Sequence, residues 1–358
     1  MKILFTGGGS GGHFYPIVAV AQKLRNLLDK EKIANVEFFF MSTEPYDERI
    51  LYENNITFKK ITAGKLRIYF SPKNITDTFK TALGIAKAFV EIFKMYPDVI
   101  FSKGGFPSFP ILVAARFFRI PVIIHESDSV PGRVNLWTGK FAQKIALSYP
   151  EAAAYFPKER VALTGNPIQH ELIEPTNENP WEKLELDPSV PVILVLGGSL
   201  GSQKINDQFI VLAPRLVEKY QIVHQTGRKN FEHVDPVIKG ILSGNPHASR
   251  YKIVPYFDPV KLKLASEATT IVVSRAGSTI FEIAAWGLPS ILIPIAESNG
   301  DHQRKNAFAY ARAGGATVIE EANLAPNLLY SELEHLMQDN ERREAMKTAA
   351  RNFAHTDA

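Results

Sequence analysis

The chain has 358 residues, of which 45% are hydrophobic and 22% charged, and a net charge of +4. A chain of this length and composition exceeds what one hydrophobic core usually supports, so we expect a globular protein of two domains. No apolar run approaches the roughly 20 residues that a membrane-spanning helix needs, and glycines interrupt the short apolar run after Lys2 before it could serve as a secretory signal. The absence of cysteine excludes disulfides, thiol nucleophiles and thiolate metal sites. We therefore expect a cytoplasmic protein.

The charge is distributed unevenly along the chain. Residues 1–164 hold 22 Lys and Arg against 14 Asp and Glu, whereas residues 165–358 hold 19 against 23. An excess of positive charge in the first half predicts an anionic partner there, for which a membrane surface and a nucleic acid both qualify. Nucleic acid is the less favoured partner, because the basic residues cluster with apolar ones and no recognition module is present.

Strand-like apolar runs alternate with helical stretches through both halves of the chain. The runs cover residues 2–6, 36–41, 98–102, 121–125 and 144–148, and then 192–196, 222–225, 252–255, 271–274 and 290–294. This βαβ rhythm predicts an α/β protein with two doubly wound parallel sheets, which bind ligands at the carboxyl ends of their strands.

The predicted domains are separated by a segment, residues 165–191, that is rich in proline and has no clear period. We expect an N-terminal domain over residues 1–164 and a C-terminal domain over residues 165–340. We also expect the last helix, about residues 341–358, to pack back on the N-terminal domain.

Each domain begins with a strand that leads into a glycine-rich turn. The first turn runs from Gly7 to Gly12, and the second from Gly197 to Ser202. Such a turn lets backbone N–H groups approach an oxyanion, and the following helix N-terminus adds roughly half a positive charge. The first turn also matches the dinucleotide fingerprint, but Glu37 begins the second strand instead of ending it, which disfavours a nicotinamide cofactor. The two turns predict two nucleotide-fold domains that face one cleft.

Four polar residues that follow predicted strands are candidate site residues. His13 begins the first helix, where a neutral imidazole can accept a proton from a hydroxyl; a capping or packing role is the alternative. Glu282 lies one helical turn after Ser278, so its carboxylate suits a ribose diol or simply a helix N-terminus. Gln303 and Asn306 share a helix face and can read sugar hydroxyls. No metal site is expected, because adjacent helical residues such as Asp301 and His302 diverge.

Four segments together resemble the MurG family, the bacterial peptidoglycan glycosyltransferases that make lipid II. They are GGGSGGHFYP, GGSLGSQKIN, SRAGSTIFEIAAWGLPSILIP and DHQRKNA, and the resemblance extends from residue 1 to about 350. It implies a GT-B fold, in which two Rossmann-like domains face a cleft. It also implies inverting transfer of N-acetylglucosamine from UDP-N-acetylglucosamine to the 4-hydroxyl of the N-acetylmuramyl unit of lipid I.

Three alternatives stay open beside this resemblance. Another GT-B enzyme that transfers a sugar from a UDP-sugar to a glycolipid acceptor would differ in acceptor use. A non-hydrolysing UDP-N-acetylglucosamine 2-epimerase shares the fold but needs no lipid acceptor. A non-catalytic subunit that binds a nucleotide sugar would tolerate the loss of His13 and Asp128.

The resemblance also implies roles for individual residues. His13 is the first candidate for the general base, followed by Asp128, which stands where some members carry asparagine, and by Glu126. The implied donor-binding residues are Gly198, Ser199, Leu200, Gly201, Phe257, Gly277, Ser278, Glu282, Gln303 and Asn306, together with Gln169, which stands where many members carry arginine. The implied acceptor or diphosphate residues are Gly9, Ser10, Gly11, Gly12, Gly104 and Gly105.

A peripheral location on the inner face of the cell membrane follows from the lipid acceptor. Residues 59–94 carry eight Lys and Arg against Asp77 and Glu91, which suits an anionic leaflet. The residues expected to contact the membrane are Leu66, Ile68, Tyr69, Phe70 and Phe117. By contrast, the apolar residues at helical spacing within residues 79–93 are expected to pack on the sheet. They are Phe79, Leu83, Ala86, Val90 and Phe93.

The resemblance implies few accessory factors. No cofactor is expected to be required, although a divalent cation such as Mg²⁺ can stimulate transfer. The expected partners are UDP-N-acetylglucosamine, undecaprenyl-linked lipid I, the anionic inner-membrane surface and proteins of cell-wall synthesis and division.

Overall fold

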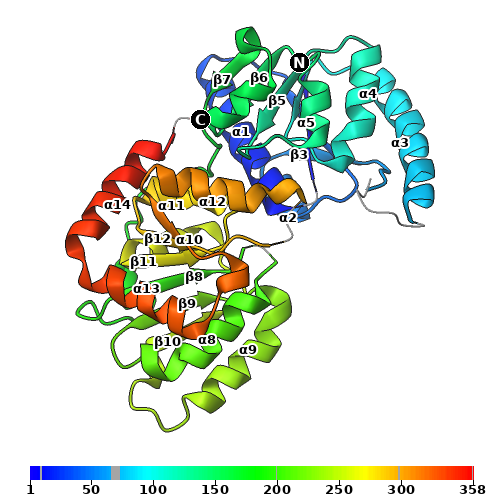
Figure 1. Cartoon of the computed structure of the whole chain (residues 1–358). Helices are drawn as coiled ribbons and strands as arrows, with labels where there is room; N and C mark the ends of the chain where they lie inside the picture. Colours follow the sequence, from blue (N-terminus) through cyan, green and yellow to red (C-terminus); the bar gives the residue numbers. More distant parts are fainter. Residues whose placement is uncertain (9, 66–72, 199, 297–298, 357) are drawn as a thin grey trace. The chain divides into compact units, whose positions relative to one another are not determined.

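The computed structural model describes residues 1–358 apart from 9, 66–72, 199, 297–298 and 357 (Figure 1). The chain divides into two compact units, Met1–Gln169 and His170–Thr356, whereas the sequence placed the division after residue 164. Each unit is a parallel sheet covered by helices, as expected for a Rossmann-like domain.

The first unit is built on a sheet whose strands are all parallel, in the order β3-β2-β1-β4-β5-β6-β7. The strands are β1 (Lys2–Thr6), β2 (Glu37–Ser42), β3 (Ile56–Lys60), β4 (Val99–Ser102), β5 (Val122–Glu126), β6 (Lys144–Leu147) and β7 (Val161–Leu163). The main helices are α1 (Gly11–Lys30), α2 (Glu48–Glu53), α3 (Lys73–Met95), α4 (Phe109–Phe117) and α5 (Arg133–Thr138). Hydrophobic cores lie on both faces of this sheet, one including α1 and the other α3 and α4.

The second unit repeats this plan, with parallel strands in the order β10-β9-β8-β11-β12-β13. The strands are β8 (Val192–Leu196), β9 (Gln221–Gln225), β10 (Tyr251–Val254), β11 (Ile271–Ser274), β12 (Ser290–Leu292) and β13 (Ala316–Val318). The helices are α6 (His170–Ile173), α7 (Pro180–Lys183), α8 (Gln203–Leu216), α9 (Arg228–Ile241), α10 (Pro259–Ala268), α11 (Thr279–Trp286), α12 (His302–Arg312), α13 (Pro326–Gln338) and α14 (Asn340–Phe353). Strand β8 is buried along its whole length, so its continuous apolar run VILVL is that of a central parallel strand.

Both sheets reverse their strand order beside their first strand. In the first unit the reversal lies between β1 and β4, and in the second between β8 and β11. Chains leaving the two strands at such a point turn to opposite faces of the sheet, which opens a crevice at the carboxyl edge. The glycine turns after β1 and β8 therefore lie where an open α/β sheet binds its ligands.

The last helix, α14, packs within the second unit. It lies against α11 and α13, and the ring of Phe353 is 4.9 Å from that of Tyr310 and 6.0 Å from that of Phe281, measured between centroids. Ala350 is fully buried in the same core. The expectation that this helix packs on the N-terminal domain is wrong, because its apolar face completes the core of the second unit.

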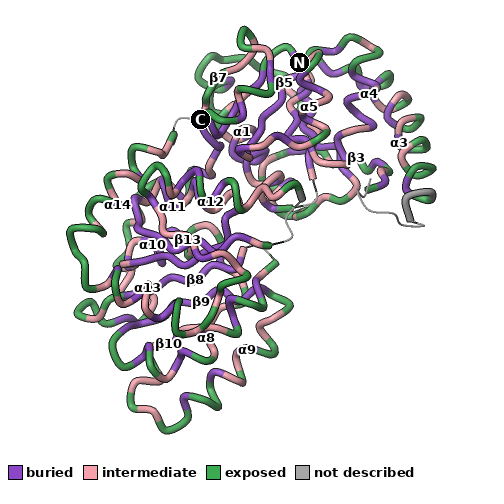
Figure 2. The backbone as a smooth tube through the Cα atoms, in the orientation of Figure 1, coloured by how far each residue is buried: buried purple, intermediate pink, exposed green. Residues whose placement is uncertain are grey.

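Helix α3 also departs from the sequence-based expectation. The face that packs on the first unit lies opposite the predicted aromatic stripe. From Gly84 onward, its buried residues are small or aliphatic, namely Gly84, Ala88, Ile92 and Met95, and Asp77 is buried nearer its start. The predicted packing stripe is exposed instead: Phe79, Leu83, Val90 and Phe93 are each at least half accessible, and Ala86 is exposed as well (Figure 2). A Cβ atom at Gly84 would overlap the carbonyl oxygen of Thr62, so only this small-residue face can approach the chain so closely.

Candidate active site

The first glycine turn of the first unit is closely packed. A Cβ atom at Gly7 would lie 2.9 Å from Ile17 Cδ1, and one at Gly8 would lie 2.6 Å from Ser42 Oγ. A side chain at either position would therefore force its neighbours to shift. Helix α1 then begins at Gly11, and the His13 amide donates to the Ser10 carbonyl at 3.1 Å. Gly12 and His13 are half-buried in the first helical turn, and Gly9 lies outside the described residues.

A second turn, Gly104–Gly105, follows β4 and meets the first. Both glycines have left-handed backbones, with φ of 76° and 83°. A Cβ atom at Gly105 would lie 3.0 Å from both His13 Nδ1 and the Gly8 carbonyl oxygen. The structure thus brings His13 against the predicted acceptor loop. Because Gly105 has no side chain, space remains beside the His13 ring.

The carboxylate of Glu126, at the end of β5, is occupied by the loop that follows. Its Oε1 accepts from the Asp128 amide, and its Oε2 accepts from the Gly132 amide and from Asn135 Nδ2, each at 3.0 Å. Burial raises the pKa of Glu126 to about 7, the charge of Asp128 adds to this rise, and these hydrogen bonds oppose it. These contacts favour a role for Glu126 in holding the loop, and they leave half-buried Asp128 better placed to meet a substrate.

Asn135 joins this site although the sequence analysis did not single it out. It is buried in α5, and its Nδ2 also donates to the His125 carbonyl at 3.2 Å. Its Oδ1 is buried and accepts no hydrogen bond from the described residues, and it would lie 2.6 Å from a Cβ atom at Gly104. An acceptor atom beside the bare Gly104 backbone suits a substrate hydroxyl or amide.

The glycine turn of the second unit has the same kind of geometry. Gly198 and Gly201 have left-handed backbones, with φ of 86° and 77°, and the Gly201 amide donates to the Gly198 carbonyl at 3.0 Å. Ser202 then caps α8, since its Oγ accepts from the Ile205 amide at 3.3 Å. Leu200 is exposed, and Ser199 lies outside the described residues. The turn presents a helix N-terminus at the reversal of the sheet, which suits a phosphate group.

The turn after β11 lies beside this one, because β11 pairs with β8. A Cβ atom at Gly277 or at Gly198 would meet nothing within 4 Å, so open space borders the backbone at both places. Ser278 precedes α11, and Glu282 is half-buried in its first turn. Burial raises the pKa of the Glu282 carboxyl to about 7.

The remaining predicted donor residues differ in exposure and contacts. Gln303 is half-buried in α12, and its Oε1 accepts from the Ile295 amide at 3.1 Å, which holds the chain after β12. Asn306 is only 1% exposed. The Phe257 amide donates to Gln225 Oε1 at 2.9 Å, so this amide is already used within the protein. Gln169 is buried in the first unit, whereas the other predicted donor residues belong to the second.

Glu321 connects three segments of the donor site and was missed by sequence reasoning. Its Oε1 binds Arg275 Nη2 at 2.5 Å, and its Oε2 lies 3.2 Å from both Lys204 Nζ and the Ala296 amide. These partners follow β8, β11 and β12. Burial alone would raise the pKa of Glu321, but the hydrogen bonds from Arg275 and Ala296 lower it. No sequence signal marks this residue, because it acts from a short helical turn that follows β13.

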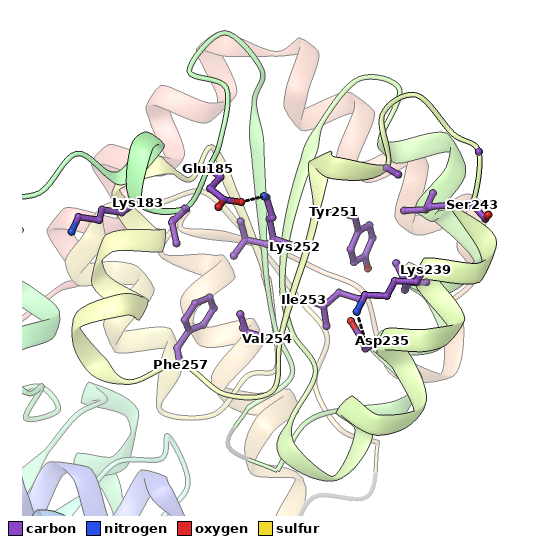
Figure 3. Close-up of a pocket in the computed structure, with 16 residues that line it drawn as sticks. Lys183, Glu185, Asp235, Lys239, Ser243, Tyr251, Lys252, Ile253, Val254 and Phe257 are labelled. Atoms are coloured by element: carbon purple, nitrogen blue, oxygen red, sulfur yellow. Dashed lines mark hydrogen bonds and ion pairs between the residues drawn. The ribbon is translucent and has the colours of Figure 1, made fainter.

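A pocket of about 600 Å³ lies along the edge strand β10 (Figure 3). It is lined by residues of β10, α9 and the segment after α7, and ion pairs join Lys252 to Glu185 at 2.8 Å and Lys239 to Asp235 at 2.7 Å. Among the described predicted site residues, Phe257 is the one that lines it. The pocket therefore borders Phe257, which the sequence analysis assigned to donor binding.

Comparisons with known proteins agree with this geometry. The model of the glycosyltransferase family 28 N-terminal domain matches residues 3–147, and that of the family 28 C-terminal domain matches residues 192–358. A protein of Bacillus thuringiensis subsp. konkukian is 38% identical over 98% of this chain and 95% of its own length. It is named UDP-N-acetylglucosamine--N-acetylmuramyl-(pentapeptide) pyrophosphoryl-undecaprenol N-acetylglucosamine transferase 2.

Solved structures share the fold. Acinetobacter baumannii MurG has a TM-score of 0.73 at 24% identity and is matched over 100% of this chain and 96% of its own. A Listeria monocytogenes protein described as a putative UDP-N-acetylglucosamine 2-epimerase has a TM-score of 0.70 at 15% identity, over 99% and 92%. Such a likeness shows the two-domain GT-B fold and does not by itself separate a transferase from an epimerase.

Proposed function

The chain belongs to glycosyltransferase family 28, and from that membership we propose that it transfers N-acetylglucosamine from UDP-N-acetylglucosamine to N-acetylmuramyl-(pentapeptide) pyrophosphoryl-undecaprenol, which is lipid I. The product is lipid II, a precursor of peptidoglycan. The observation that carries the proposal is the 38% identity, over 98% of the chain, to a protein named for this transfer. The epimerases share the fold at much lower identity, so they are the weaker candidate.

The second unit is the proposed donor site. Departure of UDP concentrates negative charge on the diphosphate, and backbone amides fixed near Gly198 and Gly201 can stabilise that charge without reorganising. The N-terminus of α8 adds a favourable dipole at the same place. Glu282 accepts hydrogen bonds from the ribose hydroxyls, and half-buried Gln303 binds the amino sugar. Asn306, at 1% exposure, is the less accessible of the two predicted amides. The ionic contacts of Glu321 hold the surrounding segments in register.

The first unit is the proposed acceptor site, with His13 as the general base. The 4-hydroxyl of the N-acetylmuramyl unit attacks the anomeric carbon, its proton passes to His13, and the bond to UDP breaks on the opposite face, with inversion. The helix N-terminus beneath His13 disfavours the imidazolium form and keeps the ring available. Asp128 is the second candidate, and the bare Gly104–Gly105 backbone admits the acceptor.

The transfer can be tested with UDP-N-acetylglucosamine and a short-chain lipid I analogue, by following UDP and the disaccharide product together. We expect one UDP for each disaccharide and negligible UDP without the acceptor. Conversion of UDP-N-acetylglucosamine to its 2-epimer without acceptor would establish the epimerase instead. Transfer to diacylglycerol in preference to the lipid I analogue would establish a different glycolipid synthase.

We also propose that the exposed stripe of α3 binds the membrane surface that carries lipid I. Among the described residues no helix is long and apolar enough to cross a bilayer. The stripe consists of Phe79, Leu83, Ala86, Val90 and Phe93, and the ring of Phe93 packs 6.0 Å from Phe118, next to exposed Phe117. Its exposed cationic neighbours are Lys80, Lys87, Lys94, Arg116 and Arg119. The predicted contact residues Leu66, Ile68, Tyr69 and Phe70 lie outside the described residues.

An apolar helix face with flanking cations suits an anionic leaflet, where each nearby Lys or Arg adds about 1 kcal/mol. Replacing Phe79 and Phe93 by serine should therefore release the protein from vesicles that contain anionic lipid, as measured by sedimentation. Val211→Ser, at an exposed apolar position in the second unit, is the matched control and should bind normally. Equal binding of the double variant and the control would contradict the proposal, as would wild-type binding no greater than to neutral vesicles.

A further inference from the structure

Lys103 is a buried cation at the centre of the first unit. It follows β4 directly, precedes Gly104 and is only 2% exposed. Its Cβ would lie 3.1 Å from a Cβ atom at Gly7, so its side chain begins beneath both glycine turns. A lysine is rarely buried unless its charge is paired or hydrogen-bonded. The groups around it show what that charge acts on.

The ammonium group of Lys103 contacts two side chains. Its Nζ donates to His125 Nδ1 at 2.7 Å and to Asn166 Oδ1 at 3.3 Å. On the other side of the ring, His125 Nε2 lies 2.8 Å from the Gly165 carbonyl oxygen, which can only accept. Nε2 must therefore carry the proton, and Nδ1 must accept from Lys103. The Gly165 carbonyl and the Lys103 ammonium thus together fix one neutral tautomer of His125.

The charge of Lys103 also acts on the predicted site. Burial lowers its pKa to about 7, while the negative charges of Glu126 and Asp128 oppose that decrease. Burial likewise lowers the pKa of His125, followed by the charge of Lys103, and His13 contributes in the same direction. The titratable groups around Lys103 are therefore His125 and Glu126 on β5 and Asp128 after it, and His13 on α1 acts on the same His125 ring. The remaining contact, Asn166, is neutral.

We propose that Lys103 is a positioning residue of the acceptor site, whose buried ammonium, with the Gly165 carbonyl, fixes His125 as the Nε2–H tautomer and keeps the neighbouring general base unprotonated. The positive charge of Lys103 favours the unprotonated form of every candidate base. A nearby cation disfavours the imidazolium form of His13 and favours the ionised form of a carboxylate. This inference rests on the proposed function, because it assigns a base to the transfer reaction, but the contact with His125 can be tested without turnover.

Loss of the charge should move the acid limb of the pH profile. We expect Lys103→Met and Lys103→Gln to raise the apparent pKa of the acid limb of kcat/KM for the lipid I analogue by about one pH unit, because each variant removes a buried positive charge from the neighbourhood of the base. Ser148→Ala is the matched control, because Ser148 Oγ lies 3.5 Å from His125 Nε2 and removal of its hydroxyl changes no charge. Its acid limb should coincide with that of the wild type. Thermal unfolding confirms that each variant is folded.

Folded neutral variants with an unchanged acid limb would overturn the proposal, as would an equal shift in Ser148→Ala. A measurement on the wild type covers the case in which neither variant folds. Nitrogen-15 NMR of the histidine rings should show His125 as the Nε2–H tautomer from pH 6 to 8, and an Nδ1–H tautomer or an imidazolium there would also overturn it. If the wild type transfers no sugar, the proposed function fails while the tautomer still tests the lysine contact.

Discussion

At the scale of single residues, the site depends on polar groups whose protonation the fold controls. His13 lies in a helical turn against Gly105, and Glu282 lies in the first turn of α11. Their position after a glycine or small-residue turn made both visible in the sequence. Asn135, Gln225 and Glu321 were not visible, because each acts through contacts with residues distant in the chain that only the folded structure brings together.

The base assignment predicts a specific defect in catalysis. His13→Gln should lower kcat by about 10²- to 10⁴-fold, the range typical of a positioned general base, and leave UDP affinity unchanged, because the proposed donor site lies in the second unit. Steady-state kinetics with saturating acceptor and calorimetry with UDP measure the two effects. His233→Gln, at an exposed histidine of α9, is the control and should retain wild-type kcat. Near-normal turnover of His13→Gln would rule out His13 as the base.

The Glu282 carboxyl predicts pH-dependent donor binding. Its pKa, raised by burial to about 7, means that it is largely protonated at pH 6 and ionised at pH 8. A carboxylate accepts from both ribose hydroxyls, so UDP affinity should increase from pH 6 to pH 8 and calorimetry should follow this increase. Glu282→Gln should bind UDP weakly at both values, whereas Glu232→Gln on α9 should follow the wild type. A wild-type affinity that is independent of pH would contradict this role.

At the scale of elements, the sequence predicted the central strands better than the edges. The continuous apolar runs of β1, β8 and β11 predicted those strands, because strands buried on both faces need apolar side chains at every position. The three strands that were missed, β3, β7 and β13, are all at sheet edges and are partly exposed. Their short, mixed sequences ITFKK, VAL and ATV give no comparable pattern.

Helix α3 shows a second limit of pattern reasoning. Its sequence carries two stripes that can pack, an aromatic one through Phe79 and Phe93 and a small-residue one through Gly84 and Ala88. Periodicity identifies both but cannot say which faces the sheet. In the structure the small-residue stripe faces the protein, because Gly84 approaches Thr62 closely. The aromatic stripe is therefore exposed and available to another surface.

The glycine turns of the second unit predict two opposite kinds of variant. Gly277→Ala should leave thermal stability unchanged, because open space surrounds the position, but it should weaken UDP binding if the diphosphate approaches this backbone. Gly201→Ala should instead reduce stability by about 1–3 kcal/mol, because its backbone is left-handed and a Cβ atom would overlap the Thr226 carbonyl. Chemical denaturation and calorimetry separate the two effects. Normal UDP binding by Gly277→Ala would contradict the proposed diphosphate position.

At the scale of the whole molecule, the two units share a sheet plan but differ in charge and in their proposed site residues. The first half of the sequence carries the excess of positive charge and the exposed stripe of α3, which suit an acceptor embedded in an anionic membrane. The second half carries the proposed donor groups Glu282, Gln303 and Asn306. Charge and motif predict this division of roles, which stays a prediction. The packing of α14 could not be predicted, because its apolar face fits either unit in the sequence alone.

The central claim is that the donor binds the second unit and the first unit presents the acceptor site. A crystal structure of the full chain with UDP-N-acetylglucosamine tests it most directly. We predict the diphosphate against the glycine turn that contains Gly198 and Gly201 and against the N-terminus of α8, with the ribose hydroxyls on Glu282. A diphosphate on the Gly7–Gly12 turn of the first unit would contradict the account.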